Sequence, residues 1–277
     1  MKILNIENPF DAPIYHEETL SSTFDAAHAL AEKGLPHGTV VCADFQEAGK
    51  GRLKPGAKQS RPWIAERGKN LLFTILLRYG DFSSIPKALT LRTGLAVSLA
   101  IEELIPSLKG HVQIKWPNDV MLNFRKVAGI LTEGDGNTIF IGVGVNVTQK
   151  DFSTELSTGN QEYRPKAASL IHLHSDLAEN ARFILLEKIL LQLYKEIEKP
   201  QEKNQGSLGS LLESWQERLL KRLYKKGETV IFSEGYSESA PLVEGTLSGI
   251  GSGGELLIIP KGEETERAFV TGELRVY

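Results

Sequence analysis

The sequence concentrates positive charge in one glycine-containing stretch, QEAGKGRLKPGAKQSRPW, which runs from Gln46 to Trp63. Between Gly49 and Arg61 this stretch has cationic side chains and no acidic residue. The cations are Lys50, Arg52, Lys54, Lys58 and Arg61. Glycine and proline oppose both helix and strand, so the stretch is predicted to be a loop. Such a loop suits a solvated linker, an arm for nucleic acid, or a lid that closes over an anionic ligand.

A second stretch, KWPNDVMLNFRKVAGILTEG, is expected to bring an amide and an ammonium to one end of a sheet. Pro117 cannot donate a ladder hydrogen bond and ends a strand, which leaves Lys115 and Asn118 near that strand end. After a tight turn, Lys126 begins the next strand and returns toward the same end. Gly129 has no side chain and would let a ligand lie against the strand. The combination favours a phosphate-bearing ligand, and the alternative is a hairpin with solvated charges.

Two further patterns match known ligand motifs only in part. The segment IGVGVNV places Gly142, Gly144 and Asn146 in a strand that is otherwise Ile and Val. A β-bulge or a close strand contact explains these glycines equally well, because no helix opens behind them as in a dinucleotide-binding loop. His172 and His174 have a metal-like spacing for a strand, but no third ligand stands out.

These residues must be positioned by an α+β fold. Helical patterns cover 22–34, 88–104, 181–199 and 209–227, and strand patterns cover 39–45, 70–77, 112–116, 119–122, 126–133 and 138–147. The turns NFR and GDGN are too short for crossover helices, so the sheet is predicted to be largely antiparallel, with flanking helices. After Gly227 only short strand patterns follow, which predicts a small β barrel. We therefore expect a domain over 1–225 and a barrel domain over 226–277.

Composition narrows the functional class. The chain has 277 residues and a formal net charge of −3 at pH 7, so wholesale electrostatic binding to nucleic acid is not expected. No apolar run is long enough to span a bilayer, and the opening residues lack the apolar core of a signal peptide. Cys42 is the single cysteine, which excludes internal disulfides and predicts a buried structural thiol in a cytoplasmic protein.

Four motifs occur in one order along the chain: QxAGxGR…RxW, KWPND, KxAGILxE and GxGxN. In this order they resemble the biotin protein ligases. The resemblance implies a class II synthetase-like catalytic domain followed by an SH3-like barrel. It also implies a reaction in which biotin and ATP form biotinoyl-5'-AMP with release of pyrophosphate. The biotinyl group is then transferred to a lysine of a biotin carboxyl carrier domain, and Mg²⁺ is expected to be bound mainly through the phosphates.

The resemblance assigns roles to residues by their place in these motifs. Lys126 and Arg52 would be catalytic, with Lys126 bridging the biotin carboxylate and the α-phosphate. The biotin-binding residues would be Ser22, Thr23, Gln46, Gly49, Arg52, Lys126, Gly129 and Gly142. The ATP-binding residues would be Arg61, Trp63, Asn118, Lys126 and Asn146.

The chain departs from the family pattern at three places. Phe24 stands where the family usually has Asn, and Lys50 replaces an arginine, which exchanges a bidentate fork for a point charge. The segment LKPGAKQS lengthens the basic loop, which is predicted to act as a mobile lid over the adenylate.

Other functions stay open at this point. Lipoate or octanoate attachment by a related ligase or transferase is the main alternative. A DNA-binding regulator is a third, but the catalytic pattern starts within about twenty residues of Met1, so no sequence-specific DNA binding is expected. An exposed sheet edge could support a homodimer.

Overall fold

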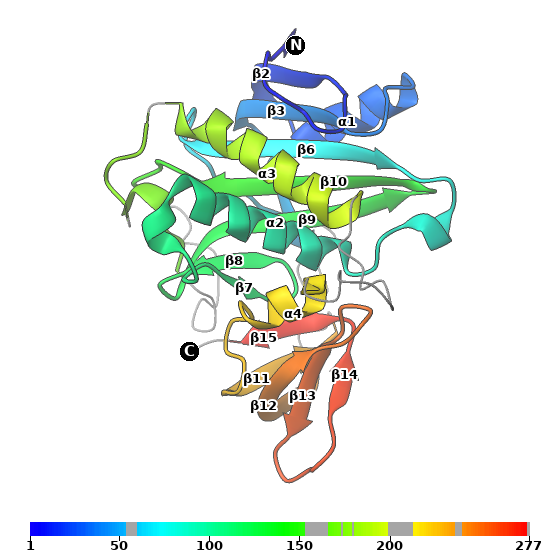
Figure 1. The fold of residues 1–277 in the computed structure, drawn as a ribbon, viewed down its shortest axis with the longest axis vertical. Coiled ribbons are helices and arrows are strands. Elements are labelled where there is room, and N and C mark those ends of the chain that lie inside the picture. The colour runs from blue at the N-terminus through cyan, green and yellow to red at the C-terminus, as the bar shows by residue number, and fades with distance from the viewer. Residues whose placement is uncertain are drawn as a thin grey trace.

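The computed structural model describes residues 1–53, 60–152, 166–172, 174–178, 180–198, 213–235 and 240–275. Its main sheet has eight strands in the order β1-β2-β3-β6-β10-β9-β8-β7 (Figure 1). Strands β2 and β3 are parallel and the other neighbouring pairs are antiparallel, which confirms the predicted mixed sheet. The strands are β1 (Lys2–Ile3), β2 (Ile14–Leu20), β3 (Thr39–Gln46), β6 (Asn70–Arg78), β7 (Gln113–Lys115), β8 (Asp119–Leu122), β9 (Arg125–Asp135) and β10 (Thr138–Asn146).

Helices cover the two faces of this sheet unequally. On one face, α2 (Leu89–Leu104) and α3 (Ala181–Ile197) pack side by side across the strands (Figure 1). The other face carries α1 (Thr23–Glu32), which packs on β3, β6 and β10. Alternation along β3 separates the two cores, because Val40 joins the cluster under α2 and α3 whereas Val41 joins the cluster under α1. The part of this second face that α1 leaves uncovered is where the candidate site lies.

The basic stretch is not entirely a loop. Its two ends pair as the hairpin strands β4 (Lys50–Leu53) and β5 (Ser60–Pro62). The prediction that its glycines and prolines prevent strand pairing is wrong for these ends, because a two-stranded ribbon tolerates Pro62 at an edge. The lengthened centre of the segment, 54–59, with Lys54 and Lys58, lies outside the described residues.

The helix predicted for 209–227 is much shorter than expected. Its described part, α4, spans Trp215–Leu220 and begins with a capping box of Ser214 and Glu217. The chain then leaves the helix because its backbone pairs with the edge strand β7: Ile114 N–H donates to Arg222 O at 2.8 Å, and Tyr224 N–H donates to Ile114 O at 2.9 Å. A tertiary contact thus replaces the helical pattern after residue 220. Short 3₁₀ turns complete the helical elements at η1 (Phe82–Ser84), η2 (Pro106–Leu108) and η4 (Leu170–His172).

The C-terminal residues form a five-stranded antiparallel sheet in the order β14-β13-β12-β11-β15, in agreement with the predicted small β domain. The strands are β11 (Thr229–Glu234), β12 (Leu242–Ile250), β13 (Leu256–Pro260), β14 (Arg267–Phe269) and β15 (Gly272–Arg275). This sheet shares a hydrophobic cluster with α2 and β7, in which Trp116 stacks edge-on against Phe232. The Trp116 indole N–H also donates to Gly254 O at 3.0 Å.

Within the described ranges, no helix combines the length and the apolar character needed to cross a bilayer. Cys42 is buried and free, as expected for a structural thiol.

Candidate active site

The residues predicted for the head of the biotin site meet at the start of α1. The Ser22 hydroxyl caps the helix by accepting from Phe24 N–H at 3.2 Å. Thr23 donates to Gln46 Oε1 twice, from its backbone N–H at 2.7 Å and from its hydroxyl at 2.9 Å. Thr74, on β6, donates its hydroxyl to Thr23 Oγ1 at 2.9 Å. The result is a chain of hydrogen bonds from Thr74 through Thr23 to Gln46, in which each side chain is held by the next.

Three glycines of β9 and β10 lie under aromatic rings. A methyl group built on Gly142 would lie 2.2 Å from Phe24 Cε2, and one on Gly144 would lie 2.6 Å from Trp63 Cε2. At Gly129, the register partner of Gly144, it would lie 2.9 Å from Trp63 Cζ3. Because these three positions have no side chains, the two rings lie directly against a strip of strand backbone. Any side chain on this strip would clash with them.

Lys126 places its ammonium above the same strip. Its Nζ lies 2.7 Å from Asp119 Oδ1 and 5.4 Å from the centroid of the Trp63 ring. A methyl group on Gly129 would lie only 3.2 Å from this Nζ. Although burial would raise the pKa of Asp119, Lys126 and Lys115 hold that pKa below its usual range. Asp119 therefore stays ionised and keeps the Lys126 ammonium beside the exposed backbone.

The two arginines of the basic stretch reach the C-terminal sheet. Arg61 makes a bidentate ion pair with Glu273, with Nη1 and Nη2 at 3.2 and 3.1 Å from the two carboxylate oxygens. Arg52 Nη2 donates to Gly272 O at 3.3 Å. Both partners belong to β15, so the C-terminal strand holds the arginines at the site. Lys50, the departure from the family arginine, pairs instead with Asp25 in α1.

Lys115 is the most deeply buried cation of the group, with 4 % of its surface exposed. Burial lowers its pKa, and the nearby carboxylates of Asp119 and Glu273 compensate only in part. Lys126 and Arg52 lower this pKa further. The mutual influence of these side chains shows that Arg52 and Lys126, distant in sequence, belong to one electrostatic cluster. Its described members are four cations, including Arg61, and two carboxylates.

The three asparagines near the site differ in how their side-chain amides are hydrogen-bonded. Asn118 is used structurally, because its amide donates to Ile130 O at 2.7 Å. Asn146 donates to Ala168 O at 3.2 Å, but its Oδ1 is buried with no hydrogen-bond partner among the described residues. Asn70, its register partner on β6, also has a buried Oδ1 without such a partner. Two adjacent buried acceptors favour a ligand that donates hydrogen bonds, since unpaired buried carbonyls are costly.

Three of these contributors were not predicted. Thr74 and Asn70 had a signal in the sequence, because they are the polar residues of the otherwise apolar run NLLFTILL. Glu273 had none, since it lies more than two hundred residues from Arg61, and the ion pair depends on how the C-terminal sheet packs. His172 and His174 form no metal site with the described residues, in which no group of three potential ligands occurs.

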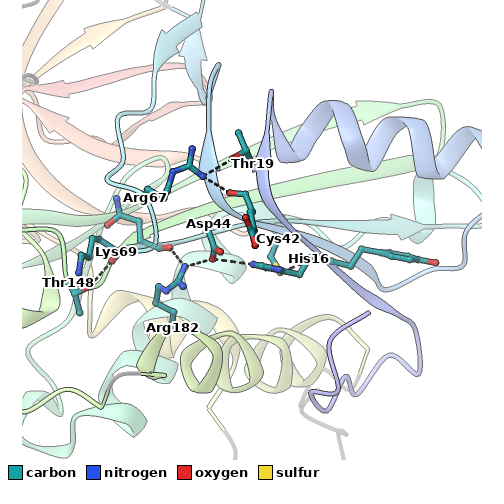
Figure 2. Close-up of polar contacts among 11 residues, drawn as sticks. His16, Thr19, Cys42, Asp44, Arg67, Lys69, Thr148 and Arg182 are labelled. Atoms are coloured by element: carbon teal, nitrogen blue, oxygen red, sulfur yellow. Dashed lines mark hydrogen bonds and ion pairs between the residues drawn. The ribbon is translucent and has the colours of Figure 1, made fainter. Parts of the chain in front are cut away.

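A separate polar cluster lies on the face under α3 (Figure 2). Asp44 Oδ1 there is contacted by His16 Nε2 at 3.1 Å and by Arg182 Nη1 at 2.9 Å. Cys42 is adjacent to His16 in the β2–β3 register, which brings Cys, His and Asp together. Burial and then Asp44 raise the pKa of the Cys42 thiol to about 12, so the thiolate needed for nucleophilic chemistry is absent at neutral pH. This cluster is structural.

Known proteins resemble this chain in sequence and in fold. The sequence profile of the Biotin/lipoate A/B protein ligase family matches residues 17–147. The chain is 35% identical over 175 residues to the bifunctional ligase/repressor BirA of Bacillus subtilis, covering 58% of this chain and 50% of that protein. It is 34% identical over 160 residues to the biotin–[acetyl-CoA-carboxylase] ligase of Mycobacterium tuberculosis, covering 56% of this chain and 53% of that protein.

Among solved structures, the biotin protein ligase of Aquifex aeolicus in complex with biotin and ATP superimposes with a TM-score of 0.67 at 26% identity. The match covers 94% of this chain and 97% of that one. By contrast, the chain spans about half the length of the first curated relatives it matches.

Proposed function

Because the profile of the Biotin/lipoate A/B protein ligase family matches residues 17–147, we propose that the chain is an ATP-dependent biotin protein ligase. It would join the carboxylate of biotin to the α-phosphate of ATP and release pyrophosphate. It would then transfer the biotinyl group to a lysine of a biotin carboxyl carrier domain. The support comes from this chain's own residues as well as from its relatives.

One observation carries the proposal: the Lys126 ammonium stands over backbone that Gly129 leaves bare. The reaction must bring a carboxylate against a polyphosphate, and the repulsion between the two anions is its main electrostatic obstacle. A cation above an open strand can contact both anions where they meet. The neighbouring Lys115, Arg52 and Arg61 add positive charge around the same position.

In the first step a biotin carboxylate oxygen attacks the α-phosphorus, and the bond from that phosphorus to the bridging oxygen of pyrophosphate breaks. Lys126 would contact the attacking carboxylate and the α-phosphate, and Arg52 would neutralise the same anions. Arg61, held by Glu273 at 3.1 Å, would exchange this partner for phosphate oxygens. No nucleophilic side chain is needed, because the substrate carboxylate is itself the nucleophile.

The polar chain at the start of α1 suits the ureido group of biotin. Gln46, Thr23 and Thr74 present both donors and acceptors within a buried corner, and Ser22 lies beside them. At the nucleotide end, the buried Oδ1 of Asn146 would accept from the exocyclic amine of the base. Trp63, which now covers Gly144 and Gly129, would have to move for the ligands to enter.

Mg²⁺ is proposed to arrive with ATP. The described residues contain no group of three metal-ligating side chains, and Asp119 is already engaged by Lys126. These residues fit a metal ion that is held mainly by the ATP phosphates. Such an ion would neutralise part of the phosphate charge. Protein ligands for it remain unassigned.

In the second step the neutral ε-amine of the acceptor lysine attacks the acyl carbon, and AMP leaves with the bonding electrons. The natural acceptor is proposed to be the carrier domain of a biotin-dependent carboxylase. We also propose a cytoplasmic location, in keeping with the free, buried Cys42. The domain boundary near residue 225, a possible homodimer and the absence of sequence-specific DNA binding stay predictions.

Mass spectrometry tests the proposal directly. A purified biotin carrier domain, incubated with the chain, biotin and Mg-ATP, is expected to gain the mass of one biotinyl group. Omission of ATP and the Lys126→Ala variant should each prevent the gain, whereas Arg125→Ala, an exposed neighbour on the same strand, should not. A carrier domain that stays unmodified in the complete reaction would refute the proposal.

The family also includes lipoate ligases, so lipoate is the necessary competitor. The polar chain of Gln46, Thr23 and Thr74 favours biotin, because the dithiolane ring of lipoate has no donors or acceptors to satisfy it. Biotin is therefore expected to raise the melting temperature more than lipoate does at equal concentration. A larger shift with lipoate would move the proposal to lipoate attachment.

A further inference from the structure

We propose that Phe24 is a specificity-determining residue: its ring forms the wall of the biotin pocket against which the sulfur-containing ring of the substrate packs. The inference rests on the proposed function, and it concerns a position at which this chain departs from the usual family pattern. It makes the substrate range of this chain depend on one buried side chain.

The ring of Phe24 is held firmly. Phe24 lies in the first turn of α1, where its N–H is tied to the Ser22 hydroxyl at 3.2 Å. Only 4 % of the residue is exposed, and it belongs to the hydrophobic cluster under α1 with Phe140, Leu76 and Leu30. A ring anchored by both a helix cap and a core cluster cannot leave without disrupting α1.

The ring occupies the volume that Gly142 leaves open. Three ring atoms lie 2.2, 2.8 and 3.1 Å from the position of a methyl group on Gly142. A side chain and this ring therefore exclude each other, and the pocket at this point has the shape that Phe24 gives it. With the smaller asparagine that is usual in the family, this volume would be larger and polar.

The ring also stands directly beside the polar corner. Thr74 is the β6 register partner of Gly142, and its hydroxyl continues the chain through Thr23 to Gln46. The pocket head therefore has hydrogen-bonding groups on one side and an aromatic ring on the other. Biotin has the same polarity, because a cyclic urea is fused to a thioether ring. A thioether sulfur makes favourable contacts with an aromatic ring.

Trp63 provides the contrast that identifies Phe24 as the permanent wall. Trp63 also covers glycines, but it directly follows β5, is partly exposed, and has an indole N–H without a partner among the described residues. Among the described residues, the hydrophobic core clusters include Phe24 and do not include Trp63. Phe24 stays, so a ligand must fit against it.

We therefore expect the chain to bind a biotin analogue less tightly when its sulfur carries additional polar atoms. Biotin sulfone has two additional oxygens on the sulfur and is otherwise identical to biotin, which makes it the matched probe. The wild-type chain should bind biotin more tightly than the sulfone, since the added oxygens would press against an apolar ring that cannot satisfy them.

Isothermal titration with biotin and biotin sulfone tests this in Phe24→Ala, Phe24→Leu and Leu30→Ala. The ratio of the two Kd values should fall about tenfold or more in Phe24→Ala, within the range that small changes in pocket fit produce. Phe24→Leu keeps more core volume and should lower this ratio less. It replaces the alanine variant in the test if Phe24→Ala does not fold. Leu30→Ala removes volume from the same helix and cluster and should leave the ratio unchanged.

A coupled variant sharpens the result. Gly142→Ala should weaken biotin binding in the wild-type background and weaken it much less together with Phe24→Ala, because the clash partner is gone. Ratios that stay within twofold of wild type in a folded Phe24 variant would overturn the inference alone. A wild-type chain that binds neither ligand would overturn the proposed function with it.

Discussion

The two faces of the main sheet treat charge in opposite ways. Under α3, Asp44 is contacted by His16 and Arg182 within 3.1 Å, so its carboxylate is engaged inside the chain (Figure 2). On the face that α1 leaves open, the described residues gather Lys115, Lys126, Arg52 and Arg61 around Asp119 and Glu273, and Lys126 lies above Gly129. The comparison indicates that the helix face uses charge for stability. Under the proposed function, the open face would offer its positive charge to anionic ligands, at a cost to stability.

The largest effect is expected from Lys126, the cation that stands over the bare backbone of Gly129. Lys126→Ala should lower biotin-dependent exchange of pyrophosphate with ATP by on the order of 10²–10³, the usual loss when one preorganised charge is removed. Stability should change little, because Asp119 retains Lys115 as a cationic neighbour. The exchange assay is read beside a thermal melt, with Arg125→Ala as the matched control. Exchange that survives would remove Lys126 from the mechanism.

The second prediction concerns Lys115. Its buried charge should contribute to activity and should also lower the stability of the fold. Because its pKa is lowered, the unfolded chain binds the proton more tightly than the folded chain. This group therefore costs stability at neutral pH, and the cost falls as pH rises toward the ordinary lysine pKa of about 10.4.

Lys115→Met should accordingly raise the free energy of unfolding, but by no more than about 1 kcal/mol, because relief of the buried charge is partly offset by the cationic neighbour that Asp119 and Glu273 lose. Pyrophosphate exchange should fall at the same time. Urea denaturation at pH 7 and the exchange assay measure the two effects on one preparation. A variant that is both less stable and fully active would contradict the distinction between the faces.

The sequence predicted the elements that carry the motifs because their signals are local. The hairpin turn that returns Lys126 beside Asp119, the Ser22 cap and the glycine positions on β10 all follow from residues near one another in the chain. The predicted helix beyond residue 220 failed for the opposite reason: its backbone pairs with β7, about a hundred residues earlier. That pairing has no counterpart in helical periodicity.

The same limit applies within the site. The glycines of β10 were visible, but the rings that cover them were not, since the approach of Phe24 and Trp63 depends on how α1 and the β4–β5 hairpin pack on the sheet. The Arg61–Glu273 pair likewise joins the two ends of the chain. Packing between distant segments decides which partners these motif residues have.

On the helix face the expected effect is on stability alone. Asp44→Asn should lower the free energy of unfolding by about 1–3 kcal/mol, because Arg182 and His16 lose their common carboxylate. Activity per folded molecule should stay near wild type. Glu263→Gln, in an exposed pair with Arg267, is the control and should cost less than about 0.5 kcal/mol.

The contacts of Asp44 with His16 and Arg182 also predict how stability depends on pH. Although burial would raise the pKa of Asp44, its bonds to His16 and Arg182 lower it below the ordinary value. The stabilisation is therefore present above the ordinary aspartate pKa of about 3.9 and is lost as pH falls through the lower pKa of the folded state. Unfolding measured from about pH 6 down to about pH 2 should show a steeper acid loss in wild type than in Asp44→Asn. Parallel curves would mean that Asp44 does not contribute.

The smallest effect is expected at Cys42, where the helix face brings cysteine, histidine and aspartate together without reactivity. With its pKa raised to about 12, the thiol has almost no thiolate at pH 8, and burial also blocks access. Iodoacetamide should leave native Cys42 unmodified over hours and modify it promptly in urea, as mass spectrometry would show. Rapid modification of the native chain would mean that this face opens in solution, and the contrast between a closed structural face and an open reactive one would then fail.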